Sequence, residues 1–193
     1  MKARTVVTAL SLVAGLPQAV HAEFSKEQLE VQIAEAGKFE WHDANGNLES
    51  WTRTEISNCQ LTLKTFKFDD QNSVYLFSSD MIDVRSFGLN DADEKTGLNV
   101  TDLTRSTPEA KMKVIYVGYV LKSGEELVRT LPMARANPEK SYEVGPVIEG
   151  RQYVIGSRSR GGFMATEPST LEPFEEWLDA IEIYAKEYCE TIS

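Results

Sequence analysis

The chain has 193 residues, of which 20 are lysine or arginine and 30 are aspartate or glutamate, so its formal net charge is −10. A negative field of this size repels phosphate backbones and anionic membrane surfaces. The composition therefore argues against nucleic-acid binding and against peripheral membrane binding. It favours solubility and, at most, cationic partners.

The first 22 residues have the three parts of a secretory signal. Lys2 and Arg4 form a positive head, an apolar run covers 6–16, and a cleavage site follows Ala22. A membrane span needs about 20 apolar residues, roughly twice this run. We therefore predict a signal peptide over 1–22 and export to the periplasm or the extracellular space.

Cleavage would leave residues 23–193, a length typical of one globular domain that can bury a real core. Residues 1–22 hold two of the 20 basic residues and none of the 30 acidic ones, so the net charge of 23–193 is −12. We expect a single acidic domain with no membrane insertion after cleavage. Its oligomeric state is not predicted.

The start of this domain has the features of a helix. Ser25 and Gln28 have the spacing of a capping box, and Gly37 supplies a stop. Between them, apolar residues recur at helical spacing (Leu29, Ile33 and Ala36). The pattern predicts a short helix over 26–36 that lies on something larger.

The period then changes to two, which is typical of strands. Strands are expected over 38–43 and 48–56, around an Asn-Gly turn, and over 59–68, where a phase slip near Phe66 indicates a bulge. A long strand over 73–87, bent near Ser78, is expected to follow. This half of the chain therefore predicts an antiparallel meander.

The second half contains two polar stretches that predict irregular connections, 88–110 and 132–150. Between them, 111–122 is apolar on both faces, which favours a central strand, and 126–131 is a further strand candidate. Gly118 interrupts the central strand as a close approach or a bend would. The last two strands are expected over 151–157 and 162–166.

The C-terminal segment predicts an amphipathic helix of about five turns. Ser169 and Glu172 again have capping-box spacing, with Pro173 in the first turn. Apolar residues then follow helical spacing (Phe174, Trp177, Leu178, Ile181, Ala185, Tyr188 and Cys189). The acidic opposite face argues against membrane binding, so we expect this helix to pack on the sheet.

The order of elements predicts an α+β fold: an antiparallel sheet or partly closed barrel of about seven strands, with an N-terminal helix and a long amphipathic C-terminal helix packed on it. This layout is loosely similar to that of pleckstrin-homology-like barrels, which also end in a capping helix. The similarity lies in the order of elements and in no motif residue.

Cys59 and Cys189 are the only cysteines, and export places them where thiols oxidise. Cys59 begins the apolar stripe of its strand, and Cys189 ends the apolar stripe of the last helix. Packing of that helix on the sheet would bring the two side chains together. We therefore predict a disulfide, with two buried free thiols as the alternative.

No catalytic, cofactor or metal motif stands out. After cleavage His42 is the only histidine, which disfavours a histidine-based metal site, and we expect a structural or exposed role for it. The acidic stretches that begin at Asp43 and Asp91 lack glycine at the sixth position of a calcium loop, so we interpret them as a hairpin turn and a solvated loop. We predict no catalytic residue, cofactor or metal.

Arg151, Arg158 and Arg160 cluster in this acidic chain, and Arg160 precedes Gly161-Gly162. Guanidinium groups beside exposed backbone N–H groups suit a carboxylate or a phosphate. Ion pairs with the acidic C-terminal helix are the alternative, and the one that we expect, because such surface pairs are common. The three arginines are nevertheless the best candidates for a ligand site.

The sequence leaves three classes of function open. The first is a non-enzymatic exported module that binds a protein, a peptide or a small ligand. The second is a hydrolase that uses paired carboxylates, which needs no histidine. The third is a structural accessory protein of the cell envelope. A cleft with two close carboxylates would favour the hydrolase, and a pocket containing Arg158 and Arg160 would favour the binding module.

Overall fold

The computed structural model describes residues 24–43, 45–87, 97–102, 113–167 and 172–189. The predicted signal peptide, the acidic stretch that begins at Asp91 and the Ser169 cap lie outside these ranges. No helix within them is long and apolar enough to cross a bilayer.

Antiparallel strands form two sheets in the described ranges. The larger sheet has seven strands in the order β1 (Lys38–His42), β2 (Leu48–Ser57), β3 (Gln60–Phe68), β4 (Val74–Asp83), β7 (Leu127–Pro132), β9 (Arg151–Arg158) and β8 (Glu143–Ile148). The smaller has three, in the order β10 (Arg160–Glu167), β6 (Lys113–Val120) and β5 (Gly97–Asp102). The seven-stranded antiparallel sheet with a helix at each end of the chain confirms the predicted fold class.

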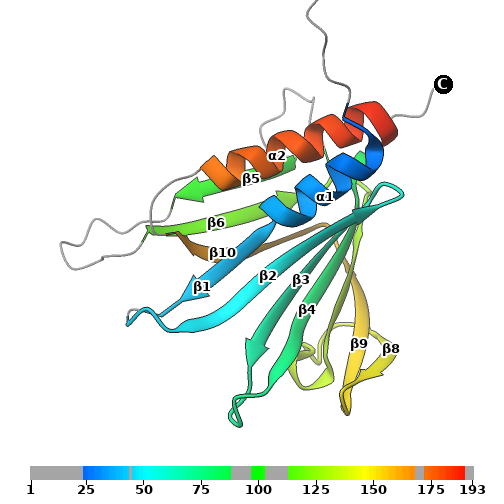
Figure 1. Ribbon diagram of the computed structural model, residues 1–193. Helices are drawn as coiled ribbons and strands as arrows, with labels where there is room; N and C mark the ends of the chain where they lie inside the picture. Colours follow the sequence, from blue (N-terminus) through cyan, green and yellow to red (C-terminus); the bar gives the residue numbers. More distant parts are fainter. Residues whose placement is uncertain (1–23, 44, 88–96, 103–112, 168–171, 190–193) are drawn as a thin grey trace, which may run out of the picture.

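One long ribbon joins the two sheets. In the smaller sheet β10 pairs with β6, Arg160 lying opposite Val120, and in the larger sheet β9 pairs with β7, Arg158 lying opposite Leu127. The ribbon passes from one sheet to the other at residues 121–126 on one side and at Ser159 on the other. In Figure 1 β5, β6 and β10 run beneath α2, whereas β2, β3 and β4 fan away from the helices.

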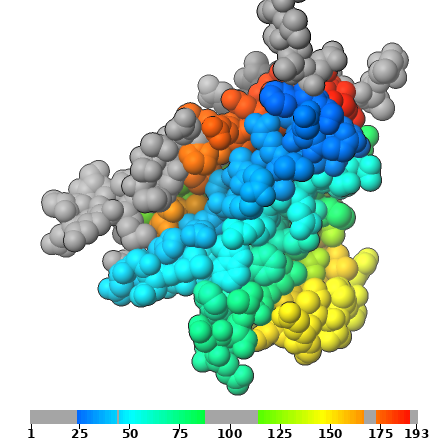
Figure 2. Space-filling model, viewed as in Figure 1, coloured from blue at the N-terminus to red at the C-terminus, as the bar shows by residue number. Residues whose placement is uncertain are grey.

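The two helices lie side by side over one end of the sheets. α1 (Lys26–Ala36) begins with the predicted capping box between Ser25 and Gln28. α2 (Glu172–Tyr184) continues into a π-helical turn, Ala185–Cys189. Figure 2 shows that the helices cover the upper part of the molecule, while the β3–β4 turn and the β8–β9 hairpin project below.

Gly37 ends α1 as expected, but without a left-handed conformation. Its φ is −85°, which any residue can adopt. A Cβ atom at Gly37 would instead lie 2.2 Å from Oγ1 of Thr54 on β2, whose hydroxyl donates a hydrogen bond to the Gly37 carbonyl. Glycine is therefore required here by the close contact between the end of the helix and the sheet.

The core lies between the helices and the upper halves of both sheets. At its centre the ring of Phe39 lies 4.5 Å from that of Phe174, 5.1 Å from that of Phe163 and 5.2 Å from that of Trp177, measured between ring centroids. α1 contributes Leu29 and Ile33, both fully buried. The lower part of the larger sheet, including the buried residues Leu131, Tyr153 and Val154, lies outside this core cluster.

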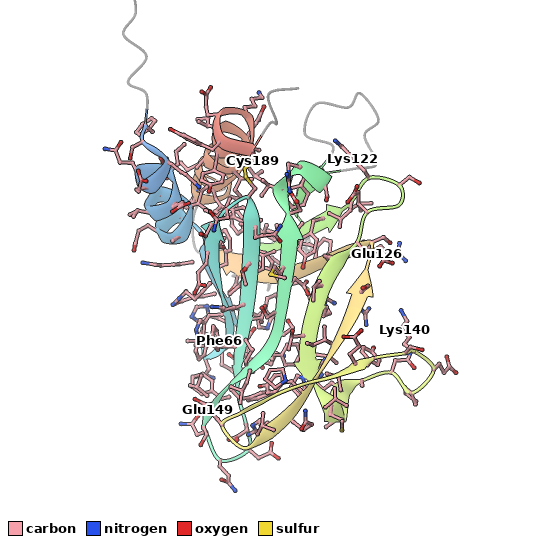
Figure 3. The ribbon with its side chains drawn as sticks, turned by 90° about the vertical axis from the view of Figure 1, so that its right-hand side faces the viewer. Phe66, Lys122, Glu126, Lys140, Glu149 and Cys189 are labelled. Atoms are coloured by element: carbon pink, nitrogen blue, oxygen red, sulfur yellow. A yellow bond between two sulfur atoms is a disulfide. The ribbon has the colours of Figure 1, made fainter. Side chains whose placement is uncertain are left out.

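Cys59 and Cys189 lie at disulfide distance, with their Sγ atoms 2.14 Å apart and their Cα atoms 5.6 Å apart. This geometry is within the range of protein disulfides and agrees with the predicted bond. The pair connects the β2–β3 turn with the last turn of the C-terminal helix. In Figure 3 Cys189 lies at the top of the molecule, and Phe66 and Glu149 lie toward the opposite end.

Strand β1, at the edge of the larger sheet, and strand β10, at the edge of the smaller sheet, are connected by a side chain and not by backbone pairing. Thr166 on β10 accepts a hydrogen bond from the backbone N–H of His42 and donates one to the carbonyl of Glu40, both on β1. Its hydroxyl also lies 3.2 Å from Nδ1 of His42. The barrel is therefore only partly closed, and His42 has a structural role at the seam between β1 and β10.

Three sequence-based boundaries were wrong. The two stretches that were expected to be irregular, 88–110 and 132–150, each contain a strand, β5 and β8 respectively. The sequence did not predict these strands because short strands rich in glycine, proline or aspartate carry little periodic signal. The strand expected to reach Phe87 ends at Asp83, because the Asp83 carboxylate accepts a hydrogen bond from the backbone N–H of Arg85 and caps a 3-10 turn over Val84–Ser86. The expected bulge is confirmed, and the extra residue is Phe77 on β4.

Candidate functional site

Arg158 and Arg160 lie together at the point where the ribbon bends, between β9 and β10. Both line an open cleft of about 600 Å³. Arg151 lies at the other end of β9, seven positions before Arg158, which is roughly 23 Å along an extended strand. The structure therefore brings two of the three predicted arginines to one site and places the third elsewhere.

The cleft lies where the ribbon passes from the larger sheet to the smaller one. One wall comes from β7 and β9, and the other from the ribbon of β6 and β10. Its lining is cationic, aromatic and glycine-rich (Tyr116, Gly118, Tyr119, Val120, Arg129, Arg158, Arg160, Gly161 and Gly162). None of these described residues is acidic.

A buried ion pair closes the inner end of the cleft. The guanidinium group of Arg129 on β7 donates through Nε and Nη2 to the two carboxylate oxygens of Asp80 on β4, directly across the strand pair. The hydroxyl of Tyr119 on β6 donates to the same carboxylate. Asp80 is 3% exposed and Tyr119 is 1% exposed, so three strands of two sheets meet at one desolvated carboxylate.

This network favours the charged form of Arg129 and the neutral form of Tyr119. Burial lowers the pKa of Arg129, but its hydrogen bond to Asp80 and the carboxylate charge outweigh burial and raise the pKa above its usual value. Burial and the Asp80 carboxylate both raise the pKa of Tyr119 well above 10. Arg129 is therefore always charged but neutralised by Asp80, and Tyr119 stays a hydrogen-bond donor.

The glycines of the cleft make room for tyrosine rings. A Cβ atom at Gly161 would lie 2.4 Å from the ring of Tyr119, and one at Gly162 would lie 2.4 Å from the hydroxyl oxygen of Tyr116. Both positions therefore require glycine for close packing against the two tyrosine rings. Aromatic residues commonly cover glycines of a neighbouring strand in this way.

Arg158 and Arg160 carry unneutralised charge. Arg158 donates a long hydrogen bond, 3.5 Å, to the hydroxyl of Tyr142, and Arg160 is exposed. Neither forms an ion pair within the part of the chain that the structure describes. Of the described acidic side chains of α2, none pairs with them, contrary to our expectation. An excess of positive charge therefore lies at the mouth of the cleft.

Arg151 has a different environment. Its guanidinium group pairs with Asp69 in the β3–β4 turn and lies over the ring of Tyr75, 4.6 Å from the centroid. It thus ties the turn to β9, and its partner is not the C-terminal helix. Arg151 has a structural role and is a useful internal control for the other two arginines.

A smaller hollow adjoins the outer side of the two arginines. Arg158 and Arg160 line it together with Glu126, Lys140, Ser157 and Ser159. Figure 3 shows Glu126 and Lys140 on the edge of the molecule beside β7 and β9. Glu126 forms no ion pair with a described residue, and it is not among the residues that line the cleft.

Other chemistry lacks support in the described ranges. No three histidine, cysteine, aspartate or glutamate side chains lie close enough together there to hold a metal ion. The Asp43 carboxylate accepts hydrogen bonds from the side-chain amide of Asn47, at 3.0 Å, and from the backbone N–H groups of Asn47 and Asn45, at 2.8 Å, which lower its pKa, as expected for a hairpin turn. The site with the most distinctive chemistry is therefore the arginine-lined cleft.

Sequence analysis missed Arg129, although the signal was present. Arg129 occupies an inward position between Leu127 and Leu131, and Asp80 occupies the equivalent position between Ser78 and Ile82. A cation and an anion at core-facing positions of two strands indicate a buried ion pair. Tyr116 and Tyr119 carried no such signal, because their roles depend on the pairing of β6 with β10.

Comparison of the chain with protein-family models, with curated proteins and with solved structures gave no match. The function is therefore argued from the cleft itself.

Proposed function

We propose that this protein is a non-enzymatic, exported module that binds a small anionic ligand between Arg158 and Arg160. The observation that carries the proposal is that both guanidinium groups line the cleft without a carboxylate partner in the described ranges. Guanidinium groups bind carboxylates and phosphates through paired, charge-assisted hydrogen bonds. The two arginines lie two residues apart across the bend, roughly 7 Å along the chain, so both can reach one ligand.

The net charge of the whole chain restricts the size of the ligand. At −10 overall, the protein repels a large polyanion such as a nucleic acid before it reaches the cleft. A small anion senses mainly the nearest charges, because screening reduces interactions beyond about 8 Å at physiological ionic strength. The cleft therefore favours small anions over acidic macromolecules.

Export is part of this proposal and has independent support. The signal-like segment 1–22 predicts it, and the cysteine pair at disulfide distance suits an oxidising compartment. No carboxylate is found among the described residues that line the cleft, so no observation favours the hydrolase alternative.

The proposal can be tested by calorimetric titration of residues 23–193 with acetate, inorganic phosphate and benzoate. We expect at least one of these anions to bind, and the double variant Arg158→Ala/Arg160→Ala to weaken binding at least tenfold. Each charge-assisted hydrogen bond that is lost contributes about 1.5–3 kcal/mol. Arg151→Ala is the matched control and should bind as the wild type does. Absence of binding by all three anions, or equal binding by the double variant, would refute the proposal.

A further inference from the structure

A second pocket, of about 290 Å³, adjoins the arginine-lined cleft. The two share Tyr116 and Gly162 as lining residues, so they lie next to each other, and we refer to them together as one two-part depression. We call this second part the aromatic pocket. Its lining combines four hydroxyl groups and one lysine, Lys67, with apolar side chains (Trp41, Phe77, Phe163 and Met164).

The bulge in β4 builds one wall of the aromatic pocket. Thr65 lies opposite Ser78 and Phe66 lies opposite Leu76, which leaves Phe77 as the extra residue. Consecutive residues of a regular strand point to opposite faces, but a bulge turns a side chain toward a new direction. Phe77 and Ser78 can therefore both line the pocket, and an aromatic ring is added to an otherwise polar sheet face.

The other wall comes from the edge strand β10 and its neighbour. Met164 on β10 is 51% exposed and Tyr116 on β6 is 37% exposed, although both are large side chains. Trp41 on β1 completes this side, and its indole N–H donates to Glu49, which leaves the ring plane free for contact. Exposed apolar surface of this kind at the rim of a polar cleft is typical of ligand sites.

Positive charge continues from the arginines toward the aromatic pocket. Lys67 Nζ lies 4.4 Å from the ring centroid of Phe77, and the guanidinium carbon of Arg135 lies 3.5 Å from it. Burial, and to a smaller extent the charge of Arg129, lower the pKa of Arg135. The surroundings are therefore electropositive, which disfavours a cationic ligand in either part of the depression.

We infer that the ligand is an amphipathic oxyanion: a carboxylate or phosphate head bound by Arg158 and Arg160, with an apolar body the size of one or two rings in the aromatic pocket. This inference rests on the proposed function and adds the ligand class. The combined volume of the two parts, about 600 and 290 Å³, is within the range of small-ligand sites. Arg129 is neutralised by Asp80, so the site provides two unneutralised guanidinium groups for one head group.

The test compares heads and bodies by calorimetric titration. Acetate and 2-naphthoate share a carboxylate and differ in the body, whereas 2-naphthoate and 2-naphthyl phosphate differ in the head. We expect 2-naphthoate to bind at least about tenfold more tightly than acetate, because about 100 Å² of apolar surface leaves water. The neutral analogue 2-naphthalenemethanol should bind at least tenfold more weakly than 2-naphthoate. The relative affinities for 2-naphthoate and 2-naphthyl phosphate then show whether the site prefers a carboxylate or a phosphate head.

The position of the body is tested by a matched pair of variants. Met164→Ala removes an apolar group of the aromatic pocket and should weaken 2-naphthoate binding about threefold to tenfold, with acetate binding unchanged. Met81, 42% exposed on β4, lies outside both pockets, so Met81→Ala should bind as the wild type does. In nitrogen–proton spectra the indole signal of Trp41 should shift on addition of 2-naphthoate, whereas that of the fully buried Trp177 should not.

Equal affinities for acetate and 2-naphthoate would overturn the inference and leave anion binding intact. The inference would also be overturned if 2-naphthoate binds more tightly than acetate but Met164→Ala does not change that difference and the Trp41 signal does not shift. The apolar body would then lie outside the aromatic pocket. If no anion binds, the proposed function itself fails. The three results are distinguishable in one set of titrations.

Discussion

Removal of the Asp80 carboxylate tests the buried network most directly. In Asp80→Ala, the charge of Arg129 loses its partner and the hydroxyl of Tyr119 loses its acceptor. The side chain of Arg129 is only 18% exposed, so solvent replaces only part of the lost interaction. Loss of one partner of a buried ion pair costs about 3–5 kcal/mol. At roughly 2–4 °C per kcal/mol for a domain of this size, the melting temperature should fall by roughly 6–20 °C.

The measurement is chemical and thermal unfolding of the wild type, Asp80→Ala, and the double variant Asp80→Leu/Arg129→Met. Replacement of both charges by apolar groups of similar volume should recover most of the loss. Lys64→Ala is the control: Lys64 pairs with Glu55 at 2.7 Å on the surface, and such pairs contribute at most about 1 kcal/mol. If Asp80→Ala destabilises the protein no more than Lys64→Ala does, the network does not hold the two sheets together.

Three further predictions concern stability. Reduction of the bond between Cys59 and Cys189, which spans 130 residues, should lower the free energy of unfolding by about 4–5 kcal/mol in the chain-entropy model, and no change in melting temperature would contradict this. Burial of Tyr184 and its hydrogen bond to Glu30 raise the pKa of the phenol to about 12. Tyr184 therefore stabilises the fold below pH 10, and this contribution to the free energy of unfolding disappears as the pH rises from 10 to 12. Tyr184→Phe should therefore be less stable than the wild type at pH 8, with the difference vanishing near pH 12; a constant difference would exclude this linkage. Gly37→Ala should lower the melting temperature through its clash with Thr54, and Gly37→Ala/Thr54→Ser should not recover it, because the Oγ1 atom that lies closest is retained.

The sequence predicts elements best where the signal is local. The capping box of Ser25 and Gln28 places α1 to the residue, and the Asn45-Gly46 turn places the β1–β2 hairpin. The bulge is also visible as a phase slip near Phe66, although the extra residue belongs to the partner strand. These features depend on contacts within a few residues, which is why periodicity and turn chemistry reveal them.

The candidate site depends on contacts that periodicity does not encode. The spacing of the three arginines suggests one cluster, yet strand β9 separates Arg151 from Arg158 by its full length. The second sheet could not be predicted either, because β5 lies in a polar stretch and its pairing with β6 is a tertiary choice. The aromatic pocket escaped prediction for the same reason: Trp41, Phe77 and Met164 come from three distant parts of the chain.

The contact between the two helices has a consequence for the order in which the protein can fold during synthesis. Leu29 and Ile33 of α1 belong to the same buried cluster as Trp177 and Ile181 of α2, about 150 residues later. At about 5–20 residues per second, a ribosome takes roughly 7–30 s to travel that distance. During this interval α1 lacks its contacts with α2, so the complete native core forms only after α2 has been synthesised. If the chain is exported as we propose, this delay would leave the core incomplete when translocation begins.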